Sequence, residues 1–176
     1  MVIIGMSGVS VILAVILNRF KIPRTKFKWA FAGIISGCLA GFLLVNIEPY
    51  QFQTPLWKSA FTQGIIMGIL RQAVNVFSSS ALIEEIIFRA FLWGYLRRLG
   101  WGENKVIWIQ GILFWLLHFY KIFSTPLTFL IGIPILTIIS TVLVLRSKQV
   151  LPAIFSHALI NILAPVLVAF LLSVAK

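Results

Sequence analysis

Hydrophobic and polar positions divide this chain into long apolar runs separated by short basic clusters. A membrane-spanning helix needs about 20 predominantly apolar residues. Runs of nearly that length cover residues 2–18, 29–47, 80–97, 106–122, 126–145 and 150–174. A further apolar stretch, 59–77, contains several polar residues and predicts either a helix along the interface or a polar-lined span. The pattern predicts an all-α fold, a polytopic transmembrane helix bundle of about six to seven spans.

The distribution of Lys and Arg predicts how the bundle is oriented. If 59–77 does not cross the membrane, the basic loops at 19–28, 97–105 and 146–148 share one side. Cytoplasmic loops carry an excess of Lys and Arg, so that side is predicted to face the cytoplasm, with both termini outside. If 59–77 does cross, the first basic loop faces the other two across the membrane. The first arrangement fits better, and it predicts a multi-pass protein of the cell membrane.

Composition supports the bilayer as the main partner of this chain. The hydrophobic share is 60% and the charged share is 11%, whereas a soluble domain carries about 25% charged residues. The net charge of +11 is spread over short clusters rather than one basic face, which argues against nucleic-acid binding. A single cysteine, Cys38, excludes a disulfide framework within the chain. Without repeats or a polar linker, residues 1–176 are predicted to form one integral membrane domain.

Ionisable residues inside the predicted spans are the candidates for chemistry. A charge in the middle of a membrane costs at least about 2.5–3.5 kcal/mol, so such residues usually have a function. The two histidines of the chain, His118 and His157, both fall inside apolar runs. One short segment, 81–89, carries three charged residues, namely Glu84, Glu85 and Arg89.

The depths of these polar groups can be compared from the sequence. Glu84, His118 and Asn161 each lie thirteen residues from a basic residue at one end of their run, and His157 lies nine residues from one. Straight helices would place all four groups about 13–20 Å from the same side of the membrane. Three predicted helices therefore bring polar groups to a shared level.

Spacing on the first of these helices suggests different roles for its two carboxylates. Glu85 and Arg89 are four residues apart, with the acid on the N-terminal side, which favours a helix ion pair. Glu84 points about 100° away around the helix and has no cation one turn distant, which suits a general acid or base. A purely structural ion pair, or a role for Glu84 in helix packing or a proton relay, would give the same pattern.

The other two helices also show four-residue spacings. His157 and Asn161 present two hydrogen-bonding groups on one face, and Phe114 stands one turn before His118. Taken alone, a membrane histidine is more often a hydrogen-bonding group between helices. Taken together, a carboxylate, two imidazoles and an amide at one depth are the groups that hydrolysis of a bond needs.

These spacings resemble the motifs of a known family, the CAAX-protease and bacteriocin-processing family (CPBP, also called Abi or type II CAAX protease). The resemblance covers about 80–165, the predicted catalytic core, and its three motifs fall in the family's order on three hydrophobic segments. They are Glu84-Glu85-x-x-x-Arg89, Phe114-x-x-x-His118 and His157-x-x-x-Asn161.

The resemblance implies an intramembrane endopeptidase whose substrate is a membrane-anchored peptide or protein. It implies that Glu84 and His118 activate a water molecule and that His157 and Asn161 stabilise the oxyanion. Glu85, Arg89 and Phe114 would support the site. The chain is short for this family, which leaves the route of substrate entry open.

Other readings of the same residues remain open. A metal-free mechanism is favoured, and the alternative is a zinc peptidase with Glu84, His118 and His157 as ligands. No HExxH helix is present. The chain could instead be a non-catalytic immunity or regulatory protein whose polar residues fix helix packing. A small transporter with a proton relay fits less well, because no inverted repeat is visible. Oligomeric state is not encoded in any recognisable pattern.

Overall fold

A computed structural model of the chain describes residues 27–47, 65–76 and 80–174. The predicted first span, 2–18, lies outside the described residues, as does most of the first basic loop. Within the described residues every regular element is helical, which agrees with the predicted all-α class. In chain order the elements are α2 (Phe27–Ile47), α4 (Ile65–Asn75), α5 (Ala81–Glu85), the π-helix η3 (Ile86–Leu92), α6 (Trp93–Arg98), α7 (Glu103–Leu117), the 3₁₀ helix η4 (Phe119–Phe123), the π-helix η5 (Thr128–Gly132), α8 (Ile133–Ser147) and α9 (Leu151–Val174).

Most of the predicted runs coincide with these helices, but the run at 106–122 does not. Its helix, α7, ends at Leu117, because His118 leaves helical geometry (φ −92°, ψ 11°) and a 3₁₀ turn follows. Pro126 then begins the next helix, at a position where the missing N–H of proline is tolerated. His118 is therefore the cap of α7 rather than a residue in the middle of a longer helix.

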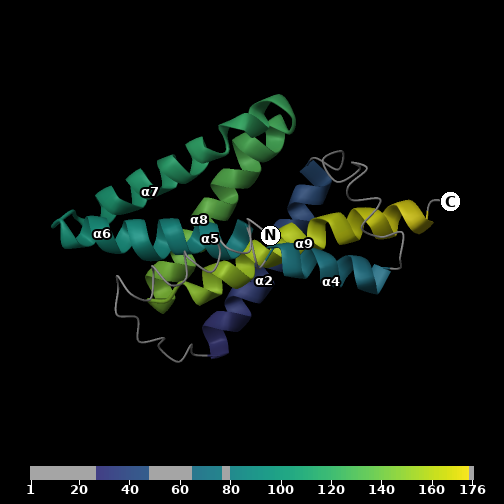
Figure 1. Ribbon diagram of the computed structural model, residues 1–176, viewed down its shortest axis with the longest axis horizontal. Helices are drawn as coiled ribbons and strands as arrows, with labels where there is room; N and C mark the ends of the chain where they lie inside the picture. Colours follow the sequence, from purple (N-terminus) through teal and green to yellow (C-terminus); the bar gives the residue numbers. More distant parts are fainter. Residues whose placement is uncertain (1–26, 48–64, 77–79, 175–176) are drawn as a thin grey trace.

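The described helices form a bundle in which α5–α6, α7 and α8 run antiparallel to one another in turn, whereas α2 and α9 run parallel. As Figure 1 shows, α5 and α6 continue one another, α7 turns back beside them, and α8 follows α7 as the second arm of a hairpin. The turn between α6 and α7 contains Gly100, whose φ of +80° favours glycine. The long helix α9 passes through the middle of the bundle and contacts α2, α4, α5 and α8.

Glycines allow α2 to pack directly against α9. Gly33, Gly37 and Gly41 lie one turn apart, and a Cβ on Gly33 would overlap the Pro152 carbonyl of α9. A Cβ on Gly37 would likewise meet the backbone of Ser156. Small residues spaced by four are typical of close helix pairs in membranes. The close packing of Gly33, Gly37 and Gly41 against α9 holds in place the helix that carries His157 and Asn161.

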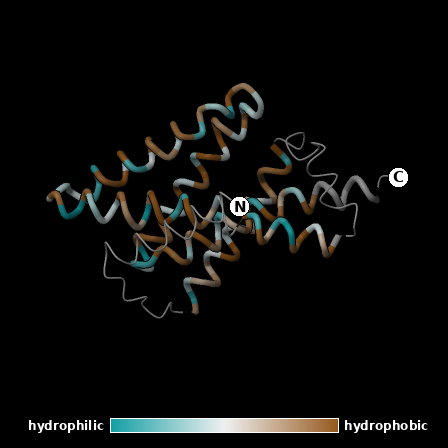
Figure 2. Tube along the Cα trace, in the orientation of Figure 1, coloured by the Kyte–Doolittle hydropathy of each residue, from teal (hydrophilic) through white to brown (hydrophobic). Residues whose placement is uncertain are grey.

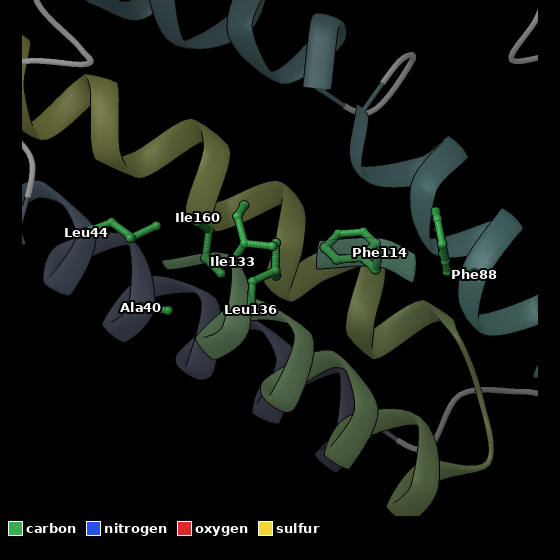
Figure 3. Packing of buried hydrophobic residues seen from close by; sticks show 7 residues of the cluster. All are labelled: Ala40, Leu44, Phe88, Phe114, Ile133, Leu136 and Ile160. Atoms are coloured by element: carbon green, nitrogen blue, oxygen red, sulfur yellow. The ribbon is translucent and has the colours of Figure 1, made fainter. Parts of the chain in front are cut away.

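The largest buried hydrophobic cluster links five helical elements next to the predicted site. Figure 3 shows its seven residues gathered between α2, η3, α7, α8 and α9: Ala40, Leu44, Phe88, Phe114, Ile133, Leu136 and Ile160. Phe114 belongs to this cluster and is completely buried. Phe114 also packs next to both histidines. The apolar core is therefore in direct contact with the polar site.

The outer surface of the described helices is largely apolar. Figure 2 shows hydrophobic residues along every described helix, with hydrophilic residues at the turn between α6 and α7. Two helices, Phe27–Ile47 and Thr128–Ser147, are long and apolar enough to cross a membrane, and Leu151–Leu167 is a shorter apolar helix. The span count of six to seven stays a prediction.

Candidate active site

The polar residues singled out by the sequence lie on three helical regions of the bundle. Glu84 and Glu85 lie at the end of α5, and Arg89 follows in η3, where the backbone is π-helical. Single-turn π-helical segments in α-helices occur often at functional sites. His118 caps α7, and His157 lies in the first half of α9. These helices are adjacent to one another, so residues far apart in the sequence become neighbours.

Glu85 is at the centre of a completely buried polar cluster. Its Oε2 lies 3.4 Å from Nε of Arg89, which forms the expected ion pair one turn along the helix. Its Oε1 lies 2.9 Å from Nδ1 of His157 on α9. The side chains of Glu85 and Arg89 are both 0% exposed. A buried carboxylate needs such partners, because an unpaired charge in an apolar interior is strongly unfavourable.

Glu84 has a different environment, although it is the neighbouring residue. Its side chain is 21% exposed, and its Oε2 lies 3.5 Å from Nε2 of His118 and 4.0 Å from Nε2 of His157. Both imidazoles therefore present the same ring nitrogen to one carboxylate oxygen. Neither distance is a direct hydrogen bond. The three atoms are close enough together for one small molecule, such as water, to contact all of them.

The other ring nitrogens determine the tautomers that we assign to the histidines. Nδ1 of His118 lies 2.9 Å from the carbonyl oxygen of Phe114, which can only accept a hydrogen bond. Nδ1 of His157 faces the carboxylate of Glu85, which also accepts. Both Nδ1 atoms therefore carry the proton, and in the neutral rings both Nε2 atoms are acceptors.

This assignment has a chemical consequence at Glu84. Two imidazole lone pairs and a carboxylate oxygen, all acceptors, face one point. Such an arrangement is stable only if a proton, a donating molecule or a cation lies among them. The geometry is thus suited to taking a proton from a molecule bound at that point.

Phe114 holds the two imidazoles and the guanidinium around one ring. Its ring centroid lies 4.8 Å from that of His118 and 6.1 Å from that of His157. The Arg89 guanidinium carbon lies 4.0 Å from the Phe114 centroid, within the range of a cation–π interaction. Phe88 packs against the same ring edge to face, at 5.2 Å. Phe114 therefore lies beside the cation of Arg89 and both histidines.

Asn161 lies one turn beyond His157 and makes contacts of its own. Its side-chain Nδ2 donates to Oγ of Ser80 at 3.4 Å, a long hydrogen bond. Its backbone carbonyl accepts a hydrogen bond from Nε2 of Gln72 on α4 at 3.2 Å. Contacts link six of the seven predicted site residues to one another, whereas the hydrogen bonds of Asn161 go to Ser80 and Gln72.

Two residues of the polar cluster lie outside the three motifs. Ser140 on α8 donates a hydrogen bond to Oε1 of Glu85 at 3.3 Å, and Gln72 reaches Asn161 from α4. Both side chains are buried. In the sequence, Ser140 and Gln72 stand out only as polar residues within apolar runs. That pattern does not identify Glu85 and Asn161 as their partners.

The described residues contain no group of three or more His, Cys, Asp or Glu side chains arranged to hold a metal ion. In the alternative zinc set, Glu84 Oε2 lies 3.5 Å from Nε2 of His118 and 4.0 Å from Nε2 of His157, and the choice between zinc and metal-free chemistry stays a prediction.

These features define a helical protein with an acid, two imidazoles and a buried ion pair enclosed by apolar helices. A comparison with protein-family models matched residues 72–163, slightly more than half of the chain, to the type II CAAX prenyl endopeptidase Rce1-like family. The chain therefore belongs to this family. Searches of curated proteins and of solved structures returned no match.

Membership agrees with the family resemblance of the three motifs and with the apolar helices described above. It supports a membrane protease or a related member of the family. The matched region begins at Gln72 on α4 and ends just after Asn161, so it includes every residue of the polar cluster. The glycine-rich helix α2, which packs against α9, precedes the matched region.

Proposed function

We propose that this protein is an intramembrane endopeptidase that hydrolyses a peptide bond of a membrane-anchored protein or peptide. The observation that carries the proposal is the position of Glu84 Oε2, which lies 3.5 and 4.0 Å from the Nε2 atoms of His118 and His157. Membership of the type II CAAX prenyl endopeptidase Rce1-like family gives the reaction class. Glu84 is the acid of this group with partial access to a bound molecule, whereas Glu85 is enclosed.

In the proposed mechanism, a water molecule binds at the point that Glu84 and His118 face. Glu84 accepts a proton from the water as the water oxygen attacks the scissile carbonyl carbon. The proton then passes to the leaving amine, so that the carboxylate is regenerated. Nδ1 of His118 is bonded to the Phe114 carbonyl at 2.9 Å, which keeps Nε2 directed to the water and to Glu84.

Negative charge develops on the carbonyl oxygen during the attack and needs hydrogen-bond donors. His157 can donate from Nε2 only as an imidazolium, and the Glu85 carboxylate, 2.9 Å from its Nδ1, would stabilise that charge. Asn161 offers an amide N–H₂ that makes only a long bond to Ser80, at 3.4 Å. We propose these two residues as the oxyanion donors, with Glu85, Arg89 and Phe114 as their support.

The mechanism that we propose is of the glutamate type, without a bound metal. In it the charge stabilisation that a zinc ion would supply comes from protonated His157, Asn161 and the buried Arg89–Glu85 pair. The zinc peptidase is the alternative, and chelation distinguishes the two. We also propose a multi-pass arrangement of about six spans, with the basic ends of α6 and α8 on the cytoplasmic side.

A second function is favoured by the same buried contacts. Glu85 joins α5, α8 and α9 through His157 and Ser140, and such a cross-link would also serve a non-catalytic immunity or regulatory protein. The two functions differ at Glu84, because a packing role does not require an ionisable group at that position.

The test uses purified protein in lipid vesicles with a membrane-anchored reporter peptide. Glu84→Gln keeps the size of the side chain but removes the base, and we expect cleavage to fall by at least about 100-fold. The matched control is Glu103→Gln, because Glu103 is a partly exposed glutamate at the start of α7 that pairs with Lys148 on the surface. Wild-type cleavage by Glu84→Gln, with the control also active, would reject Glu84 as the base, whereas a wild type that cleaves no membrane-anchored reporter would favour the packing role.

A further inference from the structure

Ser140 is a buried polar residue that none of the three motifs contains. It lies in α8, a helix that is otherwise largely apolar, and it is completely buried. Its hydroxyl donates to Oε1 of Glu85 at 3.3 Å. A fourth helix therefore reaches the polar cluster, in addition to the three helices that carry the motifs.

The carboxylate of Glu85 is held at both of its oxygens. Oε1 accepts from Ser140 and from Nδ1 of His157, whereas Oε2 faces Arg89. Two donors on Oε1, His157 at 2.9 Å and Ser140 at 3.3 Å, restrict how far the carboxylate turns relative to the imidazole. Without the Ser140 donor, Oε1 keeps only His157, and the carboxylate gains freedom to turn.

A second contact holds the register of α8, and with it the level of Ser140, relative to α7. The next residue, Thr141, accepts a hydrogen bond from Nε2 of Gln110 on α7 at 3.1 Å. Gln110, Phe114 and His118 lie four residues apart, so the α7 face that carries the site also holds α8. Gln110 is completely buried as well. The register of α8 against α7 therefore places Ser140 at the level of Glu85.

We propose that Ser140 is a positioning residue of the active site, acting on His157 through Glu85. Its hydrogen bond orients the Glu85 carboxylate so that His157 keeps its proton on Nδ1 and directs Nε2 toward Glu84. The consequence for catalysis rests on the proposed peptidase function. The effect on the imidazole does not, and it can be measured without any substrate.

The tautomer of each histidine can be read by ¹⁵N NMR of protein labelled at histidine, in detergent micelles at a pH where the rings are neutral. The chain contains only two histidines, so a His118→Ala variant assigns both. For the wild type we expect His157 as the Nδ1–H form. In Ser140→Ala we expect the His157 signals to move toward the Nε2–H form, with the His118 signals unchanged.

Two variants separate positioning from general damage to the helix. Ser140→Thr keeps the hydroxyl and is expected to retain the His157 signals of the wild type. Thr137→Val removes a hydroxyl on the same helix that donates to the Ile133 carbonyl one turn earlier, at 2.8 Å, and is expected to leave His157 unaffected. If Ser140→Ala does not fold, Ser140→Cys supplies a similar side chain with a much weaker donor.

Activity adds a second readout. We expect Ser140→Ala to lower kcat by about tenfold with little change in KM, because one hydrogen bond to a charged group is lost and substrate contacts are not. Wild-type His157 signals together with wild-type kcat in Ser140→Ala would overturn the proposal. If the wild type cleaves no reporter while Ser140→Ala still changes the His157 tautomer, the peptidase fails and the positioning of His157 stands.

Discussion

Glu85 Oε1 lies 2.9 Å from Nδ1 of His157, so that a carboxylate of the first motif orients the imidazole of the third. The adjacent acid, Glu84, faces the opposite nitrogens of both imidazoles. Two neighbouring glutamates thus contact different atoms of the same histidine. Glu85 is a fully buried partner of an ion pair, and Glu84 is the partly exposed carboxylate that we propose as the base.

This division predicts that the two glutamates differ in their effect on stability. Glu85→Gln would leave the buried Arg89 guanidinium without its counter-ion, and we expect the free energy of unfolding to fall by about 3–5 kcal/mol. Glu84→Gln should change it by less than about 1 kcal/mol, since Glu84 is partly exposed and makes no short ion pair. Reversible unfolding in mixed micelles, followed by circular dichroism, measures both. Equal losses for the two variants would contradict the assigned roles.

The glycines of α2 that pack against α9 lie outside the family-matched region. A larger side chain there is nevertheless expected to lower both stability and cleavage. Gly37→Val would place side-chain atoms against the Ser156 backbone, and we expect a loss of about 1–3 kcal/mol from overpacking. Because Ser156 precedes His157, cleavage should fall as well. Gly94→Ala is the control, since a Cβ there meets nothing within 4 Å. Full stability and activity of Gly37→Val would show that α2 and α9 are not packed as described.

Metal removal tests the glutamate-type mechanism directly. Protein purified in the presence of a strong chelator is expected to cleave the reporter peptide at the rate of untreated protein. Elemental analysis of the same sample gives the metal content. Loss of cleavage in the chelator, with recovery when zinc alone is added back, would replace this mechanism with the zinc alternative.

Much of the site was predictable because it depends on spacing within single helices. A separation of four residues places two side chains on one helix face whatever the rest of the fold does, and the Glu85–Arg89 ion pair follows from it. The Phe114–His118 ring contact follows in the same way. The long apolar runs likewise determined that the described elements would be helical.

What the sequence could not decide were the contacts between helices. Which glutamate meets which imidazole nitrogen depends on the rotation of α5, α7 and α9 about their axes, and packing of the whole bundle sets that rotation. The roles of Ser140 and Gln72 arise in the same way, because each donates to a residue more than fifty positions away in the chain. The end of α7 at Leu117 was also missed, since a uniformly apolar run does not show where helical geometry stops. The sequence thus determined the helices and the polar residues each presents, and the tertiary structure decided which of those residues meet.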